Sequence, residues 1–182
     1  MPRLNPLAPP YSAEAAAALA QMPADIALFR TVAHNPRVLT RWKEGGLLDK
    51  GSITLRQREL VILRTTALLK AEYEWGVHVA FFAAKAGFTP ADIAATVHGQ
   101  ASSWQGEEAM LIRLVGALVH NAAIDDVLWR EASVYFDAAQ MVEIISLVGF
   151  YHMVSFMVNA TGVAREPGTP AFPSRDEAAV AQ

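Results

Sequence analysis

The chain has 182 residues, of which 53% are apolar and 18% are charged, and its net charge is −3. This length and composition predict one domain with a substantial core, and the slightly acidic balance argues against nucleic-acid binding, which needs a basic surface. The sequence contains no cysteine. Disulfides, thiolate metal sites, cysteine nucleophiles and thiol redox cycles are therefore excluded.

The two ends of the chain differ from its interior. Prolines cluster in residues 1–11, predicted to form an extended N-terminal arm, and in residues 164–182, predicted to be an extended or disordered tail. Residues 12–163 are rich in the helix formers Ala, Leu, Glu and Arg and show no alternating strand pattern. The sequence therefore predicts a single all-α domain between two extended segments.

Neither a secretion signal nor a membrane span is predicted. Residues 1–10 lack the apolar stretch that a secretory signal needs. The most apolar region, residues 141–163, contains Glu143, His152 and Asn159, and these polar groups favour a buried helix over a membrane span. A cytoplasmic protein without a membrane partner is the expectation.

Capping residues and apolar periodicity predict the helices in chain order. The clearest start signals are Thr54 before an apolar run and Thr89 followed by Pro90. A turn near residues 70–71 would bring the two halves of the long fourth segment together, although neither Gly nor Pro marks one. The predicted segments are 12–22, 25–35, 36–47, 54–85, one starting at 89, 106–121, one starting at 125 or 126, and 138–161.

The candidate chemistry lies in the fourth segment. Glu74 and His78 are four residues apart and share one helical face. A carboxylate orients a neighbouring imidazole and raises its pKa, which suits acid–base catalysis. A Glu/His pair with this spacing is usually a solvated surface pair. Residues 79–82, however, are all apolar, which favours partial burial of the pair and a functional site. Glu59 would reach the same point if the chain turns near residues 70–71.

The spacing from Glu59 to His78, with Gly87 and the run Thr89-Pro90-Ala91-Asp92-Ile93 after it, resembles the carboxymuconolactone decarboxylase/AhpD-like superfamily. The likeness covers about residues 25–163, with a family core at about 36–121. It implies an AhpD-like helical bundle assembled into trimers or hexamers. The low charge and apolar helix faces also predict a homo-oligomer.

The sequence departs from the peroxidase members of this superfamily, which carry a Cys-x-x-Cys pair between the Glu and the His. Here Ala71 and Glu74 stand at the two cysteine positions, so dithiol peroxidase chemistry is not expected. The Glu four residues before the His is similar to decarboxylase-type members, which often have an arginine two residues before that His. Gly76 stands at the arginine position. Candidates to replace this arginine are Arg56, Arg58 and Arg64.

The residues and the resemblance together predict a cofactor-free acid–base enzyme, a lyase of aromatic compound catabolism that decarboxylates or isomerises a small lactone or carbonyl compound. His78 would move the proton, and Glu74 and Glu59 would orient it and set its basicity. A metal site is not favoured, because the chain has no His-x-x-x-His or Glu-x-x-His pair. Substrate contacts are expected from Tyr73, Trp75, Arg64 and Tyr151.

The alternative is a non-catalytic or redox-partner scaffold with the same fold. Buried ionisable groups cost stability. A buried set of Glu59, Glu74 and His78 therefore favours the enzyme. The expected partners are a small-molecule substrate and further copies of the chain.

Overall fold

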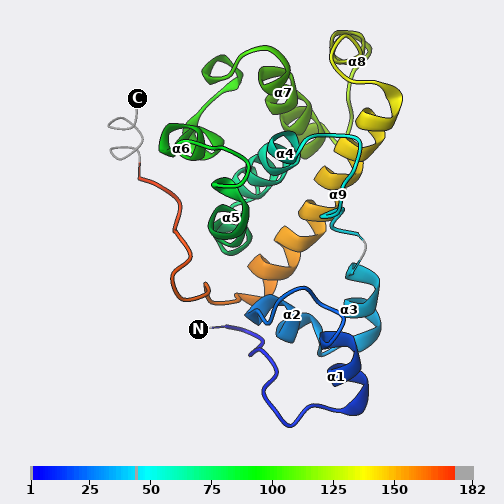
Figure 1. Cartoon of the computed structure of the whole chain (residues 1–182), viewed down its shortest axis with the longest axis vertical. Helices are drawn as coiled ribbons and strands as arrows, with labels where there is room; N and C mark the ends of the chain where they lie inside the picture. Colours follow the sequence, from blue (N-terminus) through cyan, green and yellow to red (C-terminus); the bar gives the residue numbers. More distant parts are fainter. Residues whose placement is uncertain (1, 44, 175–182) are drawn as a thin grey trace.

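The computed structural model describes residues 2–43 and 45–174. These residues form nine α-helices and no β-strand, so the predicted all-α class is confirmed (Figure 1). The helices are α1 (Ala13–Leu19), α2 (Ala27–Val32), α3 (Pro36–Trp42), α4 (Leu55–Leu68), α5 (Glu72–His78), α6 (Pro90–His98), α7 (Gly106–Asn121), α8 (Asp126–Ala132) and α9 (Ala138–Thr161). A π-helical turn (Val79–Ala83) continues α5, and a short 3-10 helix (Ala101–Ser103) precedes α7.

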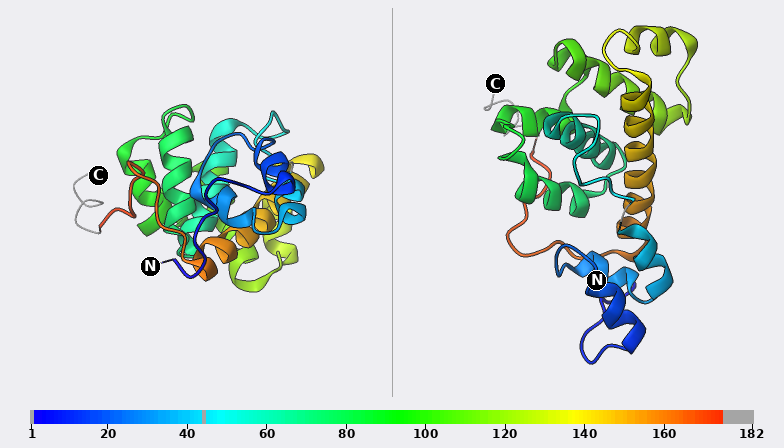
Figure 2. Two further views of the ribbon diagram at one scale, coloured as in Figure 1. Left: turned by 90° about the horizontal axis from the view of Figure 1, so that it is seen from below. Right: turned by 45° about the vertical axis from the view of Figure 1, so that its right-hand side comes forward.

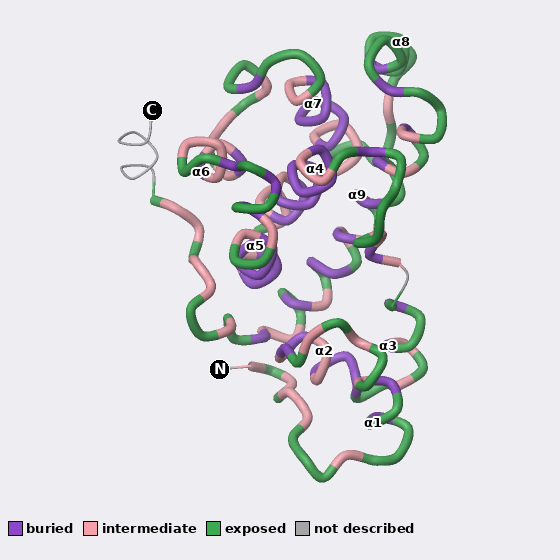
Figure 3. Tube along the Cα trace, in the orientation of Figure 1, coloured by how far each residue is buried: buried purple, intermediate pink, exposed green. Residues whose placement is uncertain are grey.

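The helix α4 lies at the centre of the fold. It packs against α5, α6, α7 and α9, and its backbone is buried over most of its length (Figure 3). The long helix α9 runs along one side of this centre, and α1–α3 form a group at the opposite end of the molecule from α8 (Figures 1 and 2). The core therefore lies between α4 and the helices around it, and α1–α3 cover one end.

The α4–α5 break is made without Gly or Pro. Lys70 adopts a left-handed conformation with φ of 56°. The N–H of Lys70 donates to the carbonyl of Ala67 at 3.0 Å, and the N–H of Ala71 donates to that of Thr66 at 2.8 Å. This pair of bonds is the Schellman motif that normally uses glycine at the left-handed position. The turn brings α5 back against α4, so the predicted single segment 54–85 is two helices.

The helix α2 begins two residues later than predicted. Asp25 does not cap it but pairs with Arg30. The first N–H groups of the helix are instead satisfied from distant parts of the chain: Ala27 donates to the Glu166 carboxylate, and Leu28 donates to the Tyr73 hydroxyl at 3.0 Å. Local sequence carries no signal for such a cap.

The helix α9 is long and apolar enough to match a membrane-spanning helix by length and composition, with a mean hydropathy of 1.7 over 18 residues. Of that window, 44% is buried inside the protein, where α9 packs on α4, α5 and α7. Core helices have the same composition, so this property alone does not distinguish a membrane span from a core helix.

The described part of the tail, residues 164–174, crosses the outer face of α5 and has no helix or strand, with one turn at residues 167–168. Phe172 packs edge-on against Trp75 and donates its N–H to Glu72 at 2.9 Å. The Pro173 carbonyl lies 2.6 Å from Nε2 of His98 on α6. The remaining predicted tail, residues 175–182, lies outside the described residues.

The tail passes close to α5 at Gly76. A Cβ atom at this position would lie 2.5 Å from the Pro170 carbonyl oxygen, which is too close for any real contact. Gly76→Ala is therefore expected to displace the tail and to lower the free energy of unfolding by about 1–3 kcal/mol, measured by urea denaturation.

Gly116→Ala is the matched control for this prediction. Gly116 lies in the middle of α7 with nothing within 4 Å of its Cβ position, so the alanine should raise stability by about 0.5–1 kcal/mol. If Gly76→Ala is as stable as Gly116→Ala, the packing of the tail on α5 does not require a glycine at position 76.

Candidate active site

A cavity of about 900 Å³ lies between α5 and the segments that cover it. Residues 21–29 form one wall, the loop after α3 forms the rim, and α9 closes the far side. Most of the lining side chains are apolar: Met22, Ile26, Leu28, Phe29, Trp42, Leu47, Leu48, Val77, Phe81, Phe82, Phe150 and Val154. Polar side chains lie at the base, where Glu74, His78 and Tyr151 meet, and at the rim, where Lys43, Asp49 and Lys85 are exposed.

The structure brings Glu59, Glu74 and His78 together. Nδ1 of His78 lies 2.7 Å from Oε2 of Glu59, and Nε2 lies 3.4 Å from Oε1 of Glu74. All three are buried, with exposed fractions of 0%, 6% and 3% for Glu59, Glu74 and His78. The expected proximity of the three groups is confirmed, and it depends on the turn at Lys70 that folds α5 back onto α4.

Arg58 completes this buried group. Its guanidinium binds the second oxygen of Glu59 through Nε at 3.0 Å and Nη2 at 2.9 Å, and it donates from Nη1 to the Leu48 carbonyl at 2.8 Å. Glu59 thus has a cationic partner on each oxygen. Arg56 and Arg64 lie elsewhere: Arg56 pairs with Glu108, and Arg64 donates to the Thr96 carbonyl. Of the three candidate arginines, only Arg58 reaches the site.

The electrostatic environment makes His78 a cation at neutral pH. Burial alone lowers the pKa of this imidazole, but the hydrogen bonds and negative charges of Glu59 and Glu74 outweigh burial and raise the pKa to about 9. Since this value lies above the ordinary 6.5, the interaction stabilises the fold fully below about pH 6.5 and is lost as pH rises through about 9. His78 therefore holds a proton that it can donate.

Glu74 keeps one oxygen without a partner. Oε1 faces His78, while Oε2 is buried and has no hydrogen bond among the described residues. A buried carboxylate oxygen without a donor is costly. This oxygen can accept a hydrogen bond or a proton from a ligand at the base of the cavity, so we regard it as a functional feature.

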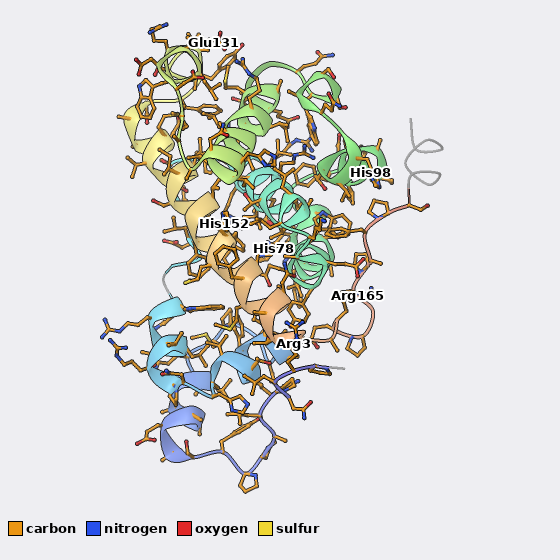
Figure 4. The ribbon with its side chains drawn as sticks, turned by 180° about the vertical axis from the view of Figure 1, so that it is seen from behind. Arg3, His78, His98, Glu131, His152 and Arg165 are labelled. Carbon is orange, nitrogen blue, oxygen red and sulfur yellow. The ribbon has the colours of Figure 1, made fainter. Side chains whose placement is uncertain are left out.

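Tyr151 stands beside the imidazole from α9. Its ring packs edge-on against that of His78 with centroids 5.1 Å apart, and Phe82 lies 5.2 Å from the same ring. Burial raises the pKa of Tyr151 well above its ordinary value, which keeps the hydroxyl protonated and able to donate. Figure 4 shows His78 in the interior of the fold, whereas His98 lies at its periphery beside the tail.

The other three expected substrate contacts lie outside the cavity. Tyr73 donates to Glu166 at 2.7 Å, Trp75 donates to Thr96 at 3.0 Å, and Arg64 binds the end of α6. Neighbours of Glu74 in sequence point about 100° away from it around a helix. These side chains hold the tail, α2 and α6 in place, and the expectation that they contact substrate has no support in their position.

Sequence reasoning missed the residues that cover the cavity. Residues 21–29 and the rim residues near Gly46 reach the site through packing between segments far apart in the chain. Within residues 2–43 and 45–174, no group of three or more His, Asp or Glu side chains is arranged to hold a metal ion.

The comparison with family models matches residues 35–119 to the carboxymuconolactone decarboxylase family. This stretch contains Glu59, Glu74 and His78. This match supports the resemblance to the carboxymuconolactone decarboxylase/AhpD-like superfamily.

Solved structures share this fold. One is an uncharacterized peroxidase-related protein from Silicibacter sp. TM1040, with a TM-score of 0.69 and 16% identity over 79% of this chain and 78% of that one. Another is described as an alkylhydroperoxidase AhpD core, an uncharacterized peroxidase-related protein from Ralstonia eutropha JMP134, with a TM-score of 0.68 and 15% identity over 77% and 76% of the two chains. A search of curated proteins found no match.

The two residues that stand at the cysteine positions of the peroxidases, Ala71 and Glu74, lie in different surroundings. Ala71 is fully buried at the start of α5, whereas Glu74 lines the cavity beside His78. At the arginine position, Gly76 faces the tail. A carboxylate therefore stands next to the imidazole, and the tail occupies the space that a side chain at position 76 would need.

Proposed function

We propose that this protein is a cofactor-free acid–base enzyme that acts on a carbonyl or lactone compound, by decarboxylation or by isomerisation next to the carbonyl. The observation that carries the proposal is the buried imidazole of His78 held between two carboxylates at the base of an apolar cavity, an arrangement that raises its pKa to about 9. Such a group donates a proton at a point where His78 and Glu74 are almost fully buried and electrostatic interactions are strong.

Both reactions pass through an enolate. In decarboxylation, the bond to the carboxylate carbon breaks, CO₂ leaves, and the electron pair moves onto the carbonyl oxygen. In isomerisation, the Glu74 carboxylate accepts a proton from the carbon next to the carbonyl, and the pair moves in the same way. The Tyr151 hydroxyl donates to the developing oxyanion, and Nε2–H of His78 returns a proton to carbon.

The remaining charged groups hold His78 in place. Glu59 binds Nδ1 and fixes the orientation of the ring, so that Nε2 is the nitrogen on the side of Glu74. Arg58 neutralises the other oxygen of Glu59. Because Arg58 donates its hydrogen bonds to Glu59 and to backbone carbonyls, we assign it no direct contact with substrate.

A scaffold without chemistry explains these groups less well. Keeping four ionisable side chains in the interior costs several kcal/mol of desolvation unless each is well paired, and the Oε2 atom of Glu74 is not paired. A fold that needed only packing would be at least as stable with apolar residues at these positions.

The proposed function is tested by proton exchange. Simple ketones and lactones are incubated with the protein in D₂O, and loss of the proton next to the carbonyl is followed by NMR. We expect exchange well above the buffer rate for at least one compound of the panel, because enolate formation is common to both reactions. Exchange at the buffer rate for a panel that spans small and large, cyclic and open-chain compounds would contradict the proposal.

We also propose that the protein acts as a homo-oligomer of the trimeric or hexameric kind. Large apolar side chains are exposed on α8 and α9: Val127, Trp129, Val142, Ile145, Met153 and Phe156. Exposed apolar groups gathered on neighbouring elements are typical of subunit contacts. Sedimentation velocity would measure the assembly directly.

A further inference from the structure

The volume of the cavity indicates the size of the substrate. This inference rests on the proposed function. At about 900 Å³ it lies near the upper end of the range for sites that enclose drug-sized ligands. A small lactone would leave most of this space empty or filled with water against apolar walls. We infer that the substrate class is a carbonyl compound with an extended apolar body, larger than the small lactone expected from the sequence.

The arrangement of polar groups gives the orientation of such a ligand. At the base, Glu74, His78 and Tyr151 supply acceptor and donor groups for a carbonyl and the carbon next to it. The walls above them are aliphatic and aromatic, and charged side chains return only at the exposed rim. The carbonyl head therefore lies at the base, and the apolar body extends along the walls towards the rim.

The wall opposite α5 comes from outside the part of the chain that matches the family. The family match begins at residue 35, whereas Ile26, Leu28 and Phe29 line the cavity from α2 and the loop before it. Glu166 and Tyr73 fix this segment by accepting its first helical N–H groups. The apolar body of the ligand thus meets a wall outside the matched range, while Glu74 and His78 at the reacting head lie inside it.

Gly46 offers a way to narrow the cavity without moving its catalytic groups. A Cβ at this position would lie 3.5 Å from the Phe150 ring, 3.6 Å from the Leu48 side chain and 3.7 Å from the Tyr151 hydroxyl oxygen, all ordinary contacts. Its backbone is not left-handed, so a Cβ at this position meets neither backbone strain nor a steric clash. Gly46→Val adds apolar volume directly above the base.

The test measures binding of ketones of increasing length by isothermal titration calorimetry in H₂O, where exchange of the proton next to the carbonyl leaves the ketone unchanged. The probes are methyl ketones with five, seven, nine and eleven carbons. For the wild type we expect affinity to rise about fourfold for each added methylene up to at least nine carbons, which is the gain for transferring one methylene out of water. Gly46→Val should reduce the affinity for the nine-carbon ketone at least tenfold while leaving that for the five-carbon ketone within about threefold.

Two controls keep the result decisive. Gly116→Ala, far from the cavity on α7, should bind the whole series as the wild type does, and Gly46→Ala replaces the valine variant if the latter does not fold. Affinity that is independent of chain length, or length dependence unchanged in both Gly46 variants, would overturn the inference. If affinity rises with chain length but no proton exchange occurs, the proposed function alone is contradicted. If exchange occurs only with short ketones and affinity does not depend on chain length, the inference alone is contradicted.

Discussion

His78→Gln is expected to lower the rate of proton exchange, on any ketone or lactone that the wild type accepts, by about 10²–10⁴-fold. Glutamine is similar in size and can still hydrogen-bond to Glu59, but it has no proton to transfer. The rate constant is measured by NMR in D₂O under saturating substrate. Because the polar contact to Glu59 is kept, the loss should appear in kcat more than in KM.

His120→Gln is the matched control for this variant, since His120 is exposed at the end of α7. It should exchange substrate at the wild-type rate. Circular dichroism and thermal unfolding establish that both variants are folded. A folded His78→Gln protein with wild-type exchange would remove His78 from the proton transfer.

Glu59→Gln is expected to give the largest loss of stability of any single change at the site. Glu59 is fully buried and separates two cations, Arg58 and His78. Removing its charge leaves Arg58 without a carboxylate partner and His78 with Glu74 alone, and breaking a buried ion pair costs about 3–5 kcal/mol. For a chain of this length, this loss corresponds to a decrease in Tm of about 6–20 °C, measured at neutral pH by calorimetry.

Glu108→Gln provides the comparison for Glu59→Gln. Glu108 pairs with Arg56 near the surface, where the two side chains are 24% and 30% exposed, and such pairs contribute at most about 1 kcal/mol. If Glu59→Gln destabilises the protein no more than Glu108→Gln does, the buried ion pairs of Glu59 with Arg58 and His78 do not stabilise the fold.

Much of the fold could be predicted because its helix ends carry local signals. Both α7 and α9 have the predicted bounds, since Gly106 and Asn121 bracket the first and Asp137 with Gly162 caps the second. The break at Lys70 could not be placed, because the residue that takes the left-handed conformation is a lysine and the hydrogen bonds that satisfy the turn leave no trace in sequence. The start of α2 depends on Glu166, almost 140 residues away along the chain.

Part of the site could likewise be predicted from the sequence, and part could not. Helical spacing and the family pattern led to Glu59, Glu74 and His78, and the structure brings them together. Closeness in sequence was misleading for Tyr73 and Trp75, because adjacent residues on a helix point in different directions. The cavity wall from residues 21–29 arises from long-range packing, which neither periodicity nor spacing reports.

The central claim is that His78 is held as a cation by Glu59 and Glu74 inside the cavity. The most direct measurement is an NMR titration of the ring nitrogens of His78 in selectively ¹⁵N-labelled protein, assigned with the His78→Gln variant. The expected result is an imidazolium signal at neutral pH with a midpoint at about pH 9. A midpoint at or below the ordinary 6.5 would mean that burial outweighs the two carboxylates, and that His78 carries no proton to donate.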